Sequence, residues 1–180
     1  MDRYMNGADA LVAAAVSEGI EVCFANPGTT EMPLVLAMDS VPGLRGILCL
    51  HENVATGAAD GYGRMAGKLA MCLLHLGPGL ANGLTNLHNA RRAHTPMLNV
   101  VGQHAMWALP ADPLLATDVE LIARTVSDHV RQTEAPAAVA SDLADAINAA
   151  MANGGENEDS RWILRRSKAA EMRRRTAATP

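Results

Sequence analysis

The sequence predicts an α/β fold, a three-layer arrangement in which a parallel sheet of about five to six strands carries helices on both faces. Short apolar runs of strand length alternate with segments of helical spacing along residues 7–151. Four of these runs end in a turn containing Gly or Pro or in an acidic residue, and a helix-like segment follows each of the first three. Such alternation is typical of parallel strands joined by right-handed crossovers.

The composition favours the same architecture. Hydrophobic residues make up 49% of the chain but aromatic residues only 3%. The core must therefore consist of Ala, Leu, Val and Met, which suits closely packed helices on a sheet better than an aromatic-rich sandwich. A chain of 180 residues is long enough for one domain and too short for two of ordinary size.

The predicted elements are bounded by Gly and Pro residues and identified by the periodicity of their apolar residues. A helix over 7–18 is closed by Gly19, Pro42-Gly43 marks a turn, and the run over 46–50 contains no polar residue, as in a buried strand. Two prolines, Pro110 and Pro113, predict a loop over 105–115. The remaining helices are predicted over 31–40, 52–66, 79–93, 118–126 and 135–151, and the strands over 21–25, 46–50, 70–75, 97–101 and 129–132.

The composition changes sharply after residue 152. Residues 1–152 hold eight Lys or Arg and fifteen Asp or Glu, a net charge of −7, whereas residues 153–180 hold seven basic and four acidic residues, a net charge of +3. We therefore predict a domain over 1–152 and an atypical charged tail over 153–180, disordered or a loosely attached helix. A basic tail could also contact an acidic partner.

Glu52 occupies a suggestive position in this plan. It follows the apolar run that ends at Leu50, and it opens a helix rich in Ala and Gly. In open α/β sheets, ligands bind at the carboxyl ends of the strands. The alternative is that Glu52 only complements the helix dipole in the first turn, a contribution of roughly 0.3–1 kcal/mol.

Four collinear segments identify a family resemblance that covers roughly residues 5–150. They are Phe24-Ala25-Asn26-Pro27-Gly28-Thr29-Thr30-Glu31, His51-Glu52-Asn53-Val54-Ala55-Thr56-Gly57-Ala58-Ala59-Asp60-Gly61-Tyr62, Leu76-Gly77-Pro78-Gly79-Leu80-Ala81-Asn82-Gly83 and Thr95-Pro96-Met97-Leu98-Asn99-Val100-Val101-Gly102-Gln103. Their order and spacing resemble those of the amino-terminal, pyrimidine-binding domain of thiamine-diphosphate-dependent enzymes. The acetolactate synthase large-subunit-like and benzoylformate decarboxylase-like proteins are the most similar members.

The resemblance implies thiamine diphosphate as cofactor and assigns roles to particular residues. It makes Glu52 the glutamate that hydrogen-bonds N1′ of the aminopyrimidine and so promotes proton removal at C2, and it places His75 opposite the reacting carbon of a 2-oxo acid substrate. A histidine that closes a strand can equally be structural. The resemblance also places five further residues against the pyrimidine or the substrate approach, although turn chemistry alone would account for some of them. Together with Glu52, the implied cofactor-binding residues are Asn26, Pro27, Pro78, Asn82 and Gln103.

Several other functions are disfavoured. The net charge of −4 argues against general nucleic-acid binding, and no apolar stretch approaches the ~18 residues that suggest a membrane span. The three cysteines lie in predicted strands without zinc-site spacing, so we expect no metal site and a soluble, cytoplasmic protein. Glycines that fit a dinucleotide-binding pattern begin at Gly61, inside a helix, which disfavours a nucleotide-binding redox domain.

The chain lacks the other half of the family's cofactor site. The resemblance implies that magnesium and the diphosphate are held by a second domain with a Gly-Asp-Gly motif, and this motif is absent from the sequence. We therefore expect a partner chain or homologous subunit that carries the diphosphate-binding domain, and an oligomer. The alternatives are a truncated or frameshifted product and a non-catalytic remnant or interaction domain.

Overall fold

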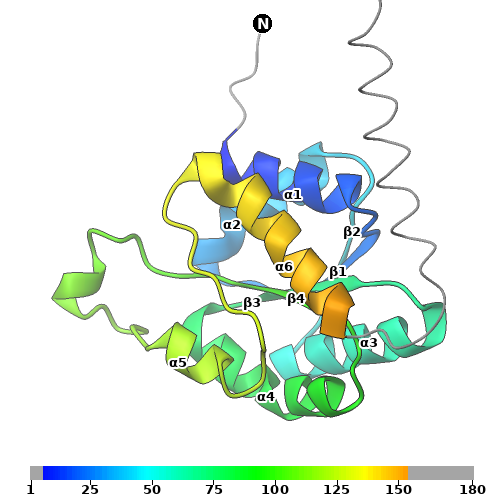
Figure 1. Cartoon of the computed structure of the whole chain (residues 1–180). Coiled ribbons are helices and arrows are strands. Elements are labelled where there is room, and N and C mark those ends of the chain that lie inside the picture. The colour runs from blue at the N-terminus through cyan, green and yellow to red at the C-terminus, as the bar shows by residue number, and fades with distance from the viewer. Residues whose placement is uncertain (1–5, 154–180) are drawn as a thin grey trace, which may run out of the picture.

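The computed structural model describes residues 6–153 and shows three layers (Figure 1). The parallel sheet has the order β2-β1-β3-β4, formed by β1 (Val22–Asn26), β2 (Arg45–Leu48), β3 (Ala70–Leu74) and β4 (Met97–Val101). One face carries α1 (Gly7–Ser17), α2 (Met32–Ser40) and α6 (Val139–Asn153), and the other carries α3 (Glu52–Ala66), α4 (Leu76–Arg92) and α5 (Val119–Ala123). Three short 3₁₀ turns, η1 (Thr29–Glu31), η2 (Leu109–Ala111) and η3 (Pro136–Ala138), complete the described chain.

Two apolar clusters fill the spaces between these layers. Met71 and Leu73 of β3 point into the cluster under α1, α2 and α6, while Cys72 and Leu74 point into the cluster under α3 and α4. This alternation is the period-two pattern of a strand buried on both faces. The predicted α/β class with a parallel sheet and helices on both faces is confirmed.

The strand count is lower than predicted, because the described residues form four strands. The segment over 129–132 has no ladder partner, and residues of this segment and of β4 line one cavity of about 600 Å³. Its Arg131 instead pairs with Asp142 of α6 at 3.2 Å. Residues 154–180, which include the predicted tail, lie outside the described residues.

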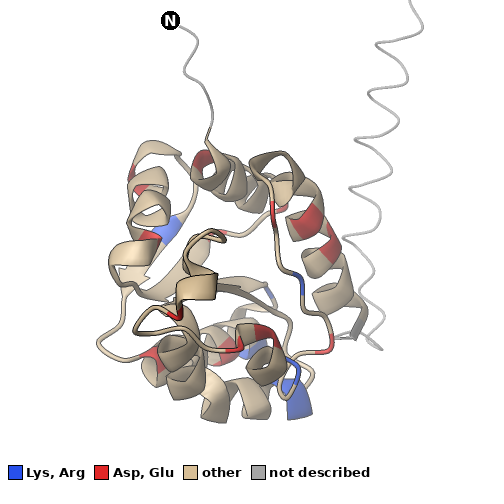
Figure 2. Ribbon diagram, turned by 90° about the vertical axis from the view of Figure 1, so that its left-hand side faces the viewer, with Lys and Arg blue, Asp and Glu red and all other residues tan. Residues whose placement is uncertain are grey.

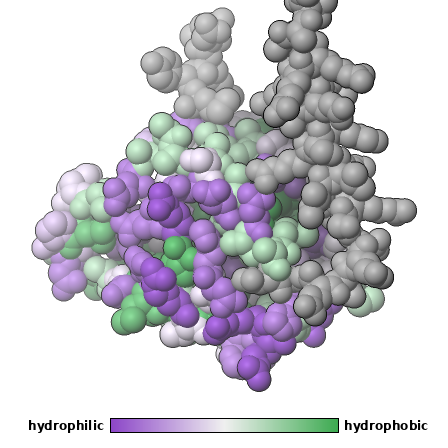
Figure 3. Space-filling model, viewed as in Figure 1, coloured by the Kyte–Doolittle hydropathy of each residue, from purple (hydrophilic) through white to green (hydrophobic). Residues whose placement is uncertain are grey.

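The expectation of a buried second strand was also wrong. β2 pairs only with β1, so it is an edge strand, and the side chains of Leu48 and Leu50 are 71% and 89% exposed. The loop between β4 and α5 protrudes from the body of the molecule (Figure 1) and exposes Trp107 and Leu114, so apolar surface is visible on that lobe in Figure 3.

Acidic residues are distributed over helices of both layers (Figure 2). Within residues 6–153, no helix combines the length and the apolar character that a membrane span requires.

Candidate functional site

The start of α3 is fixed by its own sequence. His51 has an extended backbone, and its Nδ1 accepts a hydrogen bond of 3.1 Å from the backbone N–H of Asn53. This cap satisfies one of the free amides of the first turn. Glu52 is therefore the first residue of α3, at the carboxyl edge of the sheet as predicted, and it is buried, with 7% of the residue exposed.

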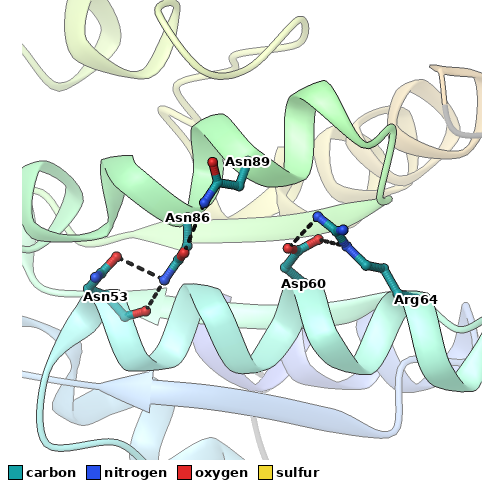
Figure 4. Close-up of polar contacts among 5 residues, drawn as sticks. All are labelled: Asn53, Asp60, Arg64, Asn86 and Asn89. Carbon is teal, nitrogen blue, oxygen red and sulfur yellow. Dashed lines mark hydrogen bonds and ion pairs between the residues drawn. The ribbon is translucent and has the colours of Figure 1, made fainter.

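Glycines bring α4 close to the first turns of α3. A Cβ atom at Gly83 would lie 2.9 Å from Thr56 Cγ2, and one at Gly57 would lie 2.7 Å from Asn86 Nδ2. The Thr56 hydroxyl donates to the Gly83 carbonyl at 3.2 Å, and Asn86 donates to the Asn53 carbonyl at 2.7 Å and to its side chain at 3.0 Å (Figure 4). These contacts fix α4 against the helix turn that carries Glu52.

The Glu52 carboxylate lies between α3 and the start of α4. Its Oε2 accepts a hydrogen bond of 3.0 Å from Asn82 Nδ2. A Cβ atom at Gly79 would lie 2.9 Å from the other oxygen, Oε1, so only glycine leaves that space open. The described residues form no hydrogen bond to Oε1, which makes it the acceptor available to a ligand.

His75 lies beside this carboxylate, just after β3. The same hypothetical Cβ atom at Gly79 would lie 3.3 Å from His75 Cβ, so Glu52 and His75 flank one glycine. The His75 side chain is 25% exposed, and its Nδ1 lies 2.7 Å from Oε2 of the fully buried Glu31. The next residue, Leu76, has a φ of 52°, an uncommon backbone conformation for a residue other than glycine.

The remaining predicted residues, Asn26, Pro27, Pro78 and Gln103, lie at different places around the sheet edge. Asn26 uses its side chain to donate to the Cys49 carbonyl at 2.7 Å, which ties the ends of β1 and β2 together, and Pro27 follows it at the same edge. Pro78 is exposed in the first turn of α4. Gln103 lines the cavity beside β4, and its side-chain oxygen accepts from the His104 amide at 2.8 Å. Glu52, His75 and Asn82 are thus brought together, whereas Gln103 lines the cavity beside β4, which none of these three residues lines.

Sequence reasoning missed Glu31. Its spacing from Gly28 is that of a capping box, and the Gly28 amide does donate to Glu31 Oε2 at 2.8 Å. A capping carboxylate is ordinarily exposed, but this residue is only 1% exposed because its carboxylate also meets His75 and Gly102. Only the fold brings these three segments together, so the available signal was the Gly-x-x-Glu spacing alone.

The buried cysteine thiols are not reactive groups. Burial, with a smaller contribution from nearby Cys49, raises the pKa of Cys23 to about 12. Burial likewise raises the pKa of Cys72 well above its ordinary value. Because the thiolate is the reactive form, these cysteines belong to the core and not to the chemistry of the site.

This arrangement defines a class of protein: an α/β ligand-binding domain with a buried carboxylate at the carboxyl edge of a parallel sheet. Residues 5–141 match the family described as the thiamine pyrophosphate enzyme, N-terminal TPP binding domain, and the chain belongs to that family. The family resemblance predicted from the sequence is therefore confirmed.

Individual relatives agree with this assignment. The chain is 57% identical over 152 residues to IlvX of Mycobacterium tuberculosis, which carries a provisional name as an acetolactate synthase large subunit; the match covers 84% of this chain and 29% of that protein. It is 32% identical over 133 residues to the acetolactate synthase large subunit of Buchnera aphidicola subsp. Schizaphis graminum, covering 72% and 23% of the two chains.

A solved structure supports the fold. The thiamine diphosphate-dependent 4-hydroxybenzoylformate decarboxylase of Rhodococcus jostii RHA1 superposes with a TM-score of 0.74 at 23% identity, covering 79% of this chain and 27% of that one. The chain thus spans between a fifth and a third of the length of these proteins.

Proposed function

We propose that the chain supplies the aminopyrimidine half of a thiamine-diphosphate site in an acetolactate synthase-like or 2-oxo acid decarboxylase-like enzyme, with Glu52 as the catalytic carboxylate. The observation that carries the proposal is the free Oε1 of a carboxylate that is buried and held on its other side by Asn82. A carboxyl group in such a dry place can share a proton with a ring nitrogen.

The residues present suit this cofactor. Gly79 leaves room next to Glu52 Oε1 that any side chain would fill, and His75 borders the same space. When bound, thiamine diphosphate supplies an electron sink for breaking the bond next to a 2-oxo carbonyl. In the proposal, Glu52 holds the proton at N1′, Asn82 fixes the carboxylate, and Pro27 and Pro78 flank the crevice from two turns.

We propose that the diphosphate and magnesium are held by a separate diphosphate-binding domain, on a partner chain or homologous subunit, in an oligomer. The exposed apolar side chains around Glu52 support this, since Leu48, Leu50 and Val54 are 71%, 89% and 58% exposed. Exposed apolar patches of this kind mark interaction surfaces. Because the sequence contains no Gly-Asp-Gly motif, we expect the purified chain alone to turn over no 2-oxo acid.

The test is Glu52→Gln in a complex reconstituted with a diphosphate-binding domain from a relative. Gln keeps the size and can accept from N1′–H, but it cannot exchange a proton. Loss of general acid–base catalysis typically slows a step by about 10²–10⁴-fold, so proton–deuterium exchange at C2 of the cofactor should slow by this order while cofactor affinity changes little. Glu134→Gln, at an exposed position, is the control.

Two outcomes would contradict the proposal. Unchanged exchange in Glu52→Gln would leave Glu52 as a helix-start residue. A complex that binds cofactor but shows no exchange even with Glu52 intact would favour the non-catalytic remnant.

A further inference from the structure

The Glu31 carboxylate is fully buried but has few hydrogen-bond partners. Its side chain is fully removed from solvent, yet it receives only two contacts from donor groups, and both fall on Oε2. These are the Gly28 amide at 2.8 Å and His75 Nδ1 at 2.7 Å. Its Oε1 is buried without a hydrogen-bond partner among the described residues.

The pair is enclosed by backbone on two sides. A Cβ atom at Gly102, directly after β4, would lie 1.6 Å from Glu31 Oε1. A Cβ atom at Gly28 would lie 2.3 Å from His75 Cε1, 2.4 Å from Nδ1 and 2.6 Å from Nε2, so the whole ring packs against this glycine. Both residues must be glycine for the His75–Glu31 pair to fit. The turn after β1, the end of β3 and the end of β4 together enclose this one contact.

We propose that Glu31 is a positioning residue that holds His75 as the Nδ1–H tautomer, so that Nε2 of the neutral ring is the acceptor. An ionised carboxylate can only accept hydrogen bonds, and no Lys or Arg pairs with Glu31 among the described residues. The hydrogen bond made by one ring nitrogen determines which nitrogen carries the proton.

This inference rests on the proposed function for its consequence. If the crevice beside Glu52 takes the aminopyrimidine and a 2-oxo acid, Nε2 can take up a proton from water and deliver it to the substrate carbonyl oxygen. The positive charge on the ring would then be balanced by the Glu31 carboxylate at 2.7 Å. The protonated His75 ring would then form an ion pair with Glu31, whose Oε2 stays fixed by the Gly28 amide.

The tautomer itself can be measured without cofactor or partner. Long-range ¹H–¹⁵N correlation spectra of the full ¹⁵N-labelled chain, recorded above neutral pH, distinguish Nδ1–H from Nε2–H for each of the six histidines. The variant His75→Asn identifies the signals of His75. We expect His75 in the unmodified chain to show the Nδ1–H pattern.

Two substitutions at Glu31 separate positioning from simple packing. In Glu31→Gln, the amide oxygen can still accept from both Gly28 and His75, so the Nδ1–H pattern should persist. Glu31→Met is similar in length but accepts nothing, so the Nδ1–H pattern should be lost. Glu21→Gln, which alters an exposed carboxylate paired with Lys68, should leave His75 unchanged.

An Nε2–H pattern in the unmodified chain would overturn the inference, as would an unchanged pattern in a folded Glu31→Met. If Glu31→Met fails to fold, the unmodified chain and Glu31→Gln still decide the question. These spectra are recorded without cofactor. An Nε2–H result would therefore contradict this inference without affecting the Glu52 proposal, and unchanged exchange in Glu52→Gln would contradict the Glu52 proposal without affecting the tautomer.

Discussion

Two glycines one turn apart on α3 should respond in opposite directions to the same substitution. Gly61 has no heavy atom within 4 Å of a hypothetical Cβ, whereas at Gly57 that atom would lie 2.7 Å from Asn86 Nδ2. Replacing a helix-interior glycine by alanine ordinarily stabilises by roughly 0.5–1 kcal/mol. Gly61→Ala should therefore raise the free energy of unfolding by about that amount.

Gly57→Ala gains the same helix propensity but displaces Asn86. That side chain makes two hydrogen bonds to Asn53, at 2.7 and 3.0 Å (Figure 4). Each is worth about 0.5–1.5 kcal/mol net, so their loss should cost about 1–3 kcal/mol. Gly57→Ala should then be about 1–3 kcal/mol less stable than Gly61→Ala, a difference in which helix propensity cancels.

Urea unfolding followed by circular dichroism measures both variants, and a double-mutant cycle tests the cause. In an Asn86→Ala background the obstructing amide is gone, so Gly57→Ala should become as favourable as Gly61→Ala. The reasoning fails if Gly57→Ala and Gly61→Ala stabilise equally in the unmodified chain, or if the penalty at position 57 persists without Asn86.

Three further predictions concern stability and association. Burial raises the pKa of Cys72 above its value in the unfolded chain, so its contribution to stability is complete below about pH 8.5 and declines above it, by up to about 1.4 kcal/mol per pH unit; urea unfolding between pH 8 and 10.5 should show a shallower decline in Cys72→Ala. Asn6 caps α1 by accepting from two amides at 2.9 and 3.0 Å, so Asn6→Ala should cost about 0.5–2 kcal/mol in the same assay, and an unchanged midpoint would contradict this. The free chain should self-associate in sedimentation experiments through its exposed apolar edge, and Leu48→Lys should reduce the association; a monodisperse monomer at high concentration would count against it.

The sequence predicted most of the fold because the strand and helix periods were unambiguous where burial was strong. β3 is buried at every position, and its apolar run was read correctly to within one residue. The misreadings lie at the sheet edges. The run ending at Leu50 has the composition of a buried strand, yet β2 has a neighbour on one side only, and apolarity does not reveal how many neighbours a strand has. The segment at 129–132 was predicted as a strand from its sequence, but it pairs with no strand and instead lines a cavity together with β4.

The candidate site was predictable where a motif carried it and unpredictable where topology did. Glu52 and Asn82 are 30 residues apart, and the motifs placed both in one crevice, where they share a hydrogen bond of 3.0 Å. Gln103 follows the last strand of the same motif set, but it lines the cavity beside β4, which neither Glu52 nor Asn82 lines. A motif gives the position of a residue along the chain, whereas the direction of its side chain depends on the backbone around it.

The glycines explain why the buried carboxylates can exist in this fold at all. Glu31 and Glu52 are each buried against a glycine, Gly102 and Gly79, whose Cβ would come within 1.6 and 2.9 Å of a carboxylate oxygen. In both cases that oxygen has no hydrogen bond from the described residues, and for Glu31 Oε1, which is fully buried, this costs free energy. A core selected for stability alone would place apolar side chains at these two positions instead of carboxylates. The fold instead keeps two carboxylate oxygens without a hydrogen bond from the described residues at one edge of the sheet, and Glu52 Oε1 is the one that we propose receives the ligand.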